Sequence, residues 1–268
     1  MRVIGRVAVN VFRESVRDKV LYNLVVFAVL LIAVSALIGQ VTAGQDVKIM
    51  KDLGLAAISI FGVMIAVFIG IGLVWKEVDR RSIYSILAKP VRRSEFVLGK
   101  YAGLALTLLV NVAVMTLAFY AVLGYIHWRT DEAVRAAWAV PALDWRMLMA
   151  IALIVVELAL VTALAILFST FSSPFLSALL TVGLWVVGQF STDLRTIDQF
   201  VTSPAVRWFA RALSYVLPNF AAFDVKAQVV YGVPVTVQYL AVTSAYGLAY
   251  VAMALGAAVL IFTRRDFK

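Results

Sequence analysis

Six apolar stretches constrain this chain more than any other feature of its sequence. They fall near residues 20–39, 53–75, 101–126, 147–171, 175–192 and 239–262. Each has about 20 residues, the length that a helix needs to cross the hydrocarbon core of a bilayer. With 63% hydrophobic and only 15% charged residues, the composition also excludes a soluble globular protein. We therefore predict an all-α polytopic membrane protein with six transmembrane helices.

The distribution of basic residues predicts how these helices are oriented. Fifteen of the 24 Lys and Arg residues precede the first stretch, separate the second from the third, or follow the last: Arg2, Arg6, Arg13, Arg17, Lys19, Lys76, Arg80, Arg81, Lys89, Arg92, Arg93, Lys100, Arg264, Arg265 and Lys268. Since cytoplasmic connections accumulate basic residues, we expect both termini in the cytoplasm. The net charge of +9 then reflects topology and does not indicate nucleic-acid binding. No Pro-rich or Gly/Ser-rich linker divides the sequence, so residues 1–268 are expected to form one transmembrane domain.

Residues 1–19 have the pattern of an amphipathic helix. At about 3.6 residues per turn, Val3, Val7 and Val11 share one face. The opposite face carries Arg2, Arg6, Arg13 and Arg17. Such a helix lies in the headgroup layer with its arginines toward the lipid phosphates. It would anchor the chain at the membrane surface, and as an elbow helix it would also touch a cytoplasmic partner.

The connection at residues 76–100 is basic and also partly apolar. Residues 83–88 have the spacing of a short amphipathic helix that Pro90 would end. A loop that only fixes topology has no need of large apolar residues, and the acids among its bases indicate ion pairs across an interface. We therefore favour a cytoplasmic coupling helix, which takes force from a soluble partner, over a solvated basic loop. The residues expected to make this contact are Glu77, Asp79, Arg80, Arg81, Tyr84, Lys89, Pro90, Arg92, Arg93 and Glu95.

Glu157 lies near the middle of the fourth apolar stretch. A carboxyl group at that depth is unfavourable unless it has a partner or a function. It could face the substrate path, relay protons or, while protonated, hydrogen-bond across a subunit interface. The alternative is a structural group paired with Ser, Thr or Tyr of another span. The sequence leaves these roles open.

Residues 193–238, on the predicted outer side, are too apolar for a simple exposed loop. Large apolar residues such as Val206, Phe209 and Leu213 recur among arginines. This pattern predicts an interfacial or re-entrant helix. We expect this segment to serve as a membrane-parallel strut, as an extracytoplasmic gate or as a dock for an outer partner.

Residue types needed for catalysis and for cofactor binding are scarce in this sequence. It contains no cysteine, and this excludes thiolate chemistry. It has only one histidine, His127, so a site built from several histidines is also excluded. A phosphate loop of the pattern G-x-x-x-x-G-K-[ST] is also missing. We therefore expect that the chain is not an enzyme and binds no cofactor itself.

Residues 76–103 resemble the signature between the second and third spans of ABC-2 type transporter permeases. The matching residues are Glu77, Asp79, Lys89-Pro90-Val91, Arg93-Ser94-Glu95-Phe96 and Leu98-Gly99-Lys100. Supporting matches are the amphipathic N-terminus, the turn at 168–173, the stretch 217–220 and the C-terminal residues 262–267. Arg81 departs from the family pattern, which usually has glycine at that position.

This resemblance implies a permease half-transporter in the cytoplasmic membrane of a prokaryote. Two permease subunits, identical by default, would pair with two copies of an ATP-binding cassette ATPase that binds ATP and Mg²⁺. Residues 76–100 would make the main contact and residues 172–174 a smaller one. The implied function is export of an amphipathic or lipid-like substrate. The alternative is ATPase-driven motion passed to an extracytoplasmic partner without transport, whereas a secondary transporter would usually show inverted repeats and paired intramembrane charges.

Overall fold

The computed structural model describes residues 2–41, 46–79, 92–138, 140–191, 208 and 217–264. Within these ranges all regular elements are helices, which confirms the all-α prediction. The long helices are α2 (Lys19–Val41), α3 (Asp46–Asp79), α5 (Arg93–Arg129), α7 (Arg146–Ser169) and α12 (Val237–Arg264). The shorter ones are α1 (Arg2–Ser15), α6 (Glu132–Ala136), α8 (Pro174–Gln189), η2 (Phe220–Phe223) and α11 (Lys226–Val230).

Five of the described helices, α2, α3, α5, α7 and α12, are long and apolar enough to cross a membrane. They coincide with five of the six predicted spans. The remaining predicted span, 175–192, corresponds to α8, which has only 16 residues. At 1.5 Å per residue α8 is roughly 24 Å long, less than the hydrocarbon thickness of about 30 Å. The sixth crossing therefore stays a prediction.

Helix α8 begins at a tight turn after α7. Ser173 is its N-cap and accepts a hydrogen bond from the Leu176 backbone N–H at 3.5 Å. Pro174 occupies the first helical position, where its missing N–H has no intrahelical partner to lose. The Ser172 hydroxyl also lies 2.7 Å from that of Ser177. These contacts reverse the chain within residues 170–173, as the sequence predicts.

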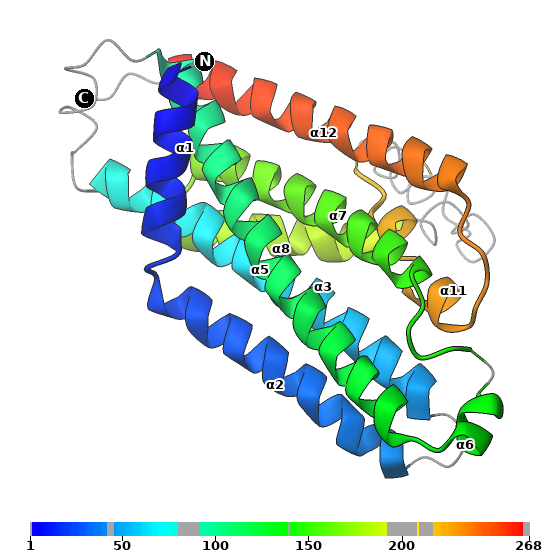
Figure 1. The fold of residues 1–268 in the computed structure, drawn as a ribbon. Coiled ribbons are helices and arrows are strands. Elements are labelled where there is room, and N and C mark those ends of the chain that lie inside the picture. Colours follow the sequence, from blue (N-terminus) through cyan, green and yellow to red (C-terminus); the bar gives the residue numbers. More distant parts are fainter. Residues whose placement is uncertain are drawn as a thin grey trace.

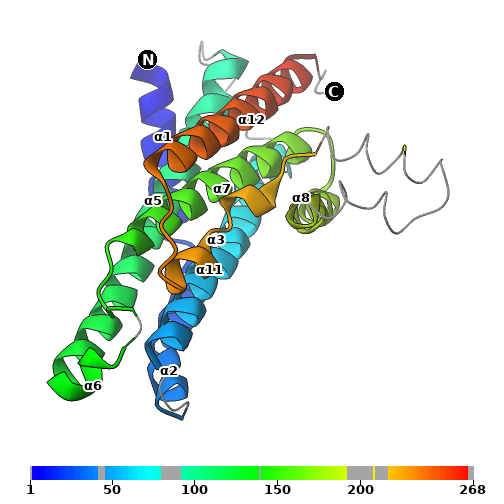
Figure 2. The same ribbon diagram turned by 90° about the vertical axis from the view of Figure 1, so that its right-hand side faces the viewer.

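Helix α7 is the centre of the bundle. Its buried residues include Leu153, Leu160 and Val161, none of which is accessible to solvent. It packs against α3, α5, α8 and α12, and also against η2 and α11. Figures 1 and 2 show the neighbouring helices arranged around it, with α2 at the edge of the bundle. Much of the apolar surface of α2 faces outward, as expected for a helix at a lipid boundary.

Glycines bring α3 close to two of its neighbours. A Cβ atom at Gly54 would overlap the ring of Phe119 on α5, and one at Gly62 would overlap Leu158 on α7. Small residues at such positions let helix backbones approach closely, which is how membrane helices gain packing energy. Gly54 and Gly62 thus hold α3 close to α5 and α7.

The two ends of the bundle are built differently. Figure 1 shows the start of α1, the start of α5 and the end of α12 together at one end, which we call the terminal end. Helix α6 lies at the opposite end, which we call the α6 end. There the buried Lys51 Nζ donates to the Pro141 carbonyl at 2.7 Å, and the Tyr120 hydroxyl donates to the Asp144 carbonyl at 2.9 Å. These bonds fix the connection before α7 to α3 and α5.

Candidate functional site

Five of the ten residues predicted to contact a soluble partner lie at the terminal ends of α3 and α5. Glu77 and Asp79 belong to the last turn of α3. Arg92, Arg93 and Glu95 open α5. The other members of the set, Arg80, Arg81, Tyr84, Lys89 and Pro90, lie outside the described residues. The structure thus gives the two helices that flank this segment.

Both flanking helices are longer than the predicted spans. Helix α3 continues to Asp79, where we expected residue 75 as the end, and α5 begins at Arg93, where we expected residue 101. Hydropathy marks only the apolar part of a helix, and the charged turns beyond it go undetected. With 34 and 37 residues, the helices are roughly 51 and 56 Å long.

The first turn of α5 is stabilised by its own acid. The Arg92 backbone N–H donates to Glu95 Oε2 at 3.2 Å, three residues ahead. This is the reciprocal half of a capping box, and it places a negative charge near the positive end of the helix dipole. The bond gives Glu95 a local role in addition to the predicted interface contact.

Arg93 is directed toward the last helix. Its guanidinium donates to the carbonyl oxygens of Phe262 at 3.2 Å and Thr263 at 3.1 Å, both at the end of α12. One turn later, the ring of Phe96 stacks on that of Phe262 with centroids 5.9 Å apart. Lys100 Nζ lies 4.9 Å from the Phe96 ring centroid, within cation–π range. The sequence gives no local signal for this junction, because its partners are far apart in the chain.

The elbow helix α1 packs against the same part of α5. Gly99 lies against Val7, and Gly103 lies against Val11, so closely that a Cβ atom at either glycine would overlap α1. The apolar face of α1 therefore packs against α5 through Val7 and Val11. Its predicted lipid-facing arginines Arg6, Arg13 and Arg17 are exposed, and Arg2 lies in its first turn.

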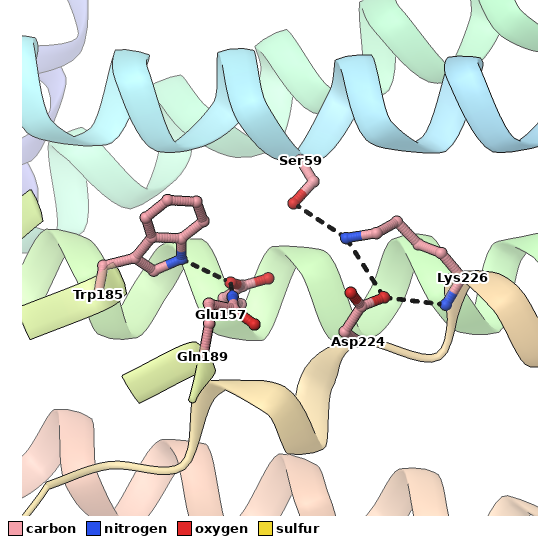
Figure 3. A network of polar contacts seen from close by, with 6 residues as sticks. All are labelled: Ser59, Glu157, Trp185, Gln189, Asp224 and Lys226. Atoms are coloured by element: carbon pink, nitrogen blue, oxygen red, sulfur yellow. Dashed lines mark hydrogen bonds and ion pairs between the residues drawn. The ribbon is translucent and has the colours of Figure 1, made fainter. Parts of the chain in front are cut away.

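Glu157 lies in the middle of α7 and is almost completely buried. Its Oε1 accepts hydrogen bonds from Trp185 Nε1 at 2.8 Å and from Gln189 Nε2 at 2.9 Å (Figure 3). Both donors come from one face of α8, four residues apart. A partner from another helix was among our alternatives, but the donors are Trp and Gln, where we named Ser, Thr or Tyr. The spacing of two polar groups on one face of an apolar helix could have identified them.

A charged pair lies close to Glu157 and was missed by sequence reasoning. Lys226 Nζ is 3.3 Å from Asp224 Oδ1 and donates to Ser59 Oγ at 3.5 Å (Figure 3). Ser59 is a residue of α3, so the pair connects the segment after η2 to the bundle. The Asp224 side chain is 42% exposed and that of Lys226 is 18% exposed. We call Glu157, Trp185, Gln189, Ser59, Asp224 and Lys226 the polar network.

The end of the predicted outer segment returns into the bundle. Phe220, Phe223, Val229 and Val230 are buried, and η2 and α11 pack on α7. We call residues 217–230 the re-entrant residues because the chain returns into the helix bundle there, and their position relative to the membrane stays a prediction. The helix predicted from the apolar residues between 206 and 216 lies outside the described residues, apart from Trp208, which is exposed.

The comparison with protein families covers nearly the whole chain. A family model described as ABC-2 family transporter protein matches residues 6–267. The chain belongs to the ABC-2 transporter family. It is therefore a multi-pass membrane permease of an ABC transporter and partners with an ATP-binding cassette ATPase. No curated protein shows a significant match to this permease.

The family assignment confirms the resemblance first recognised in residues 76–103. The terminal ends of α3 and α5 and the polar network all fall inside the matched residues of the permease. Within the described residues, no three His, Asp or Glu side chains are grouped as ligands for a metal ion. The candidate sites of the permease are the partner-contact face at the terminal end and the polar network inside the bundle.

Proposed function

We propose that this permease exports an amphipathic or lipid-like substrate, driven by an ATPase subunit that binds residues 76–100 on the cytoplasmic side. Hydrolysis of ATP with Mg²⁺ takes place on the partner, and the chain itself is neither an enzyme nor a cofactor-binding protein. Two identical permease subunits and two ATPase subunits form the transporter in the cytoplasmic membrane of a prokaryote. The observation that carries the proposal is the family match over residues 6–267.

The lengths of α3 and α5 support the contact with the ATPase. Both exceed the hydrocarbon thickness of about 30 Å by roughly 20 Å or more, so part of each helix extends beyond the membrane core. The basic segment between them begins and ends on these extensions. We take these extensions to bring the segment within reach of a soluble partner.

A groove between α5 and α7 supports the apolar character of the substrate. It has a volume of about 330 Å³, and the residues that line it are all Ala, Leu or Val. Leu106 and Leu109 on one wall are partly exposed, and Val155 and Ala159 form part of the other wall. Such a surface accepts a hydrocarbon chain and offers nothing to a hydrated ion.

The alternative proposal is motion without transport. The re-entrant residues 217–230 are packed against α7, so a shift of the bundle would also move the outer segment. An extracytoplasmic partner bound to that segment would then receive mechanical work. An ATPase activity stimulated by an outer protein, and by no amphipathic molecule, would favour this alternative.

Purification from the native membrane in mild detergent tests the ATPase contact. We expect a soluble protein with a phosphate loop to co-purify, and Glu77→Lys with Asp79→Lys to abolish that co-purification without preventing membrane insertion. Asp131→Lys with Glu132→Lys makes the same charge change at the α6 end and should leave the complex intact. If both double variants kept the ATPase, residues 76–100 would not be its binding site.

Reconstitution tests the substrate class. The complex in proteoliposomes should move fluorescent phospholipid or a cationic amphipathic dye in an ATP-dependent way, with Mg²⁺ required. Failure with both probes, combined with ATPase stimulation by an extracytoplasmic protein, would replace export by the mechanical alternative.

A further inference from the structure

Helix α12 is bound to α5 at the terminal end of the bundle. The last carbonyl groups of a helix have no intrahelical partner and form the negative end of its dipole. Arg93 satisfies two of them, those of Phe262 and Thr263, with its positive charge. Phe96 lies on the same face of α5, three residues later, and adds the ring contact with Phe262. The first turn of α5, directly after the ATPase-binding segment, is thus attached to α12.

The other half of α12 holds the re-entrant residues 217–230. The Asn219 backbone N–H donates to the Tyr246 hydroxyl at 2.9 Å, and the Tyr239 hydroxyl donates to the Ala222 carbonyl at 2.7 Å. Gly247 lies against the Phe223 ring, with two ring carbons 3.0 Å from where its Cβ atom would be, and a Cβ atom there would overlap Val156 of α7. Hydrogen bonds and close packing therefore join this half of α12 to the segment that carries Asp224 and Lys226.

Helix α12 joins these two attachments without a break. It has 28 residues, roughly 42 Å of helix, and contains no proline that would kink it. Figure 1 shows it running from the terminal end to the region of η2 and α11. A rigid helix fixed at both ends passes a displacement of one end to the other.

We infer that α12 transmits motion from the ATPase-binding segment to residues 217–230, with Arg93 and Tyr246 as the positioning residues at its two attachments. This inference rests on the proposed function, because it assumes that the ATPase acts through residues 76–100. It adds a route: the first turn of α5 moves α12, and α12 moves the segment that carries the charged pair of the polar network.

Distance measurements between spin labels test this route, since the natural chain has no cysteine. One pair, Leu98→Cys and Leu260→Cys, reports on the attachment of α5 to α12. A second pair, Val134→Cys and Val233→Cys, reports on residues near the re-entrant segment, and all four side chains are at least partly exposed. Each pair is measured in the permease–ATPase complex before and after addition of ATP, Mg²⁺ and orthovanadate. Labelled subunits are diluted with unlabelled ones so that distances between two copies do not contribute.

Without further substitutions, the distribution of the α5–α12 distance should stay narrow. The Val134–Val233 distance should shift when ATP, Mg²⁺ and orthovanadate are added. Arg93→Ala should broaden the first distribution, in the permease alone as well as in the complex, and abolish the shift of the second. Because Arg93 also belongs to the predicted ATPase contact, the shift is measured only in complexes that retain the ATPase subunit. Arg93→Lys, which keeps a donor and a charge, should restore part of the shift. Arg264→Ala removes an exposed cation from the same helix end and should change neither distance. Tyr246→Phe should keep the first distance and lose the shift of the second.

Three results would overturn the inference. The first is an unchanged shift in Arg93→Ala despite a broadened α5–α12 distance, because motion would then bypass α12. The second is an α5–α12 distance that Arg93→Ala leaves narrow, and the third is the absence of any shift in the unmutated complex. If the unmutated permease bound no ATPase, the proposed function would be contradicted instead. The α5–α12 distance, measured in the permease alone, would still test the Arg93 attachment.

Discussion

Glu157 shows how a single buried acid joins two helices of this permease. Its Oε1 accepts the side-chain N–H groups of Trp185 and Gln189 on α8, so replacement by alanine would leave both groups without an acceptor. We expect Glu157→Ala to lower the free energy of unfolding by about 2–4 kcal/mol. Glu157→Gln keeps an acceptor oxygen of the same reach and should lose much less. Thermal unfolding in detergent, followed by tryptophan fluorescence, measures both.

Glu132→Gln is the matched control for this comparison, because that carboxylate is exposed on α6 and should be insensitive to neutralisation. Equal losses for Glu157→Gln and Glu157→Ala would mean that the negative charge itself is required. The hydrogen-bonding explanation of Glu157 would then be wrong, and a role in substrate or proton movement would become the better hypothesis.

At the scale of elements, the packing of α1 on α5 depends on two glycines. Gly99 and Gly103 leave room for the valines of α1, and a larger side chain must push the elbow helix away. We expect Gly103→Leu to destabilise the permease by roughly 1–3 kcal/mol, as overpacking does in other tightly packed sites. Gly124→Leu is a matched control in the same helix, since nothing lies within 4 Å of a Cβ atom there. Thermal unfolding of the two variants under identical conditions should separate them, and equal melting temperatures would contradict the close contact.

At the scale of the whole molecule, orientation in the membrane is predicted by charge and can be measured directly. A membrane-impermeant maleimide added to intact cells should label Trp128→Cys, near the α6 end, because that position is highly exposed. Val9→Cys, on α1 at the terminal end, should react only after the membrane is permeabilised. The natural chain contains no cysteine, so each signal comes from one position. The reverse pattern would invert the topology and move the ATPase contact to the other end.

The sequence predicts the parts of this fold that depend on the length of apolar stretches. Five spans and the turn before Pro174 follow from hydropathy and turn chemistry. Contacts between distant segments could not be predicted in this way. Arg93 with α12, and Lys226 with Ser59, are separated by 167 residues or more, and local spacing contains no information about them.

The short helix α8 has a consequence for the lipid around the protein. Phe175, Leu179 and Val186 expose an apolar surface on a helix of roughly 24 Å, whereas neighbouring helices are long enough for the full hydrocarbon thickness. If α8 forms the predicted sixth crossing, acyl chains beside it must shorten or tilt to match it, while those beside α2 remain extended. Such a crossing would give the perimeter of the permease a thin side and a thick side, and the acyl-chain length of the host membrane would then affect this protein.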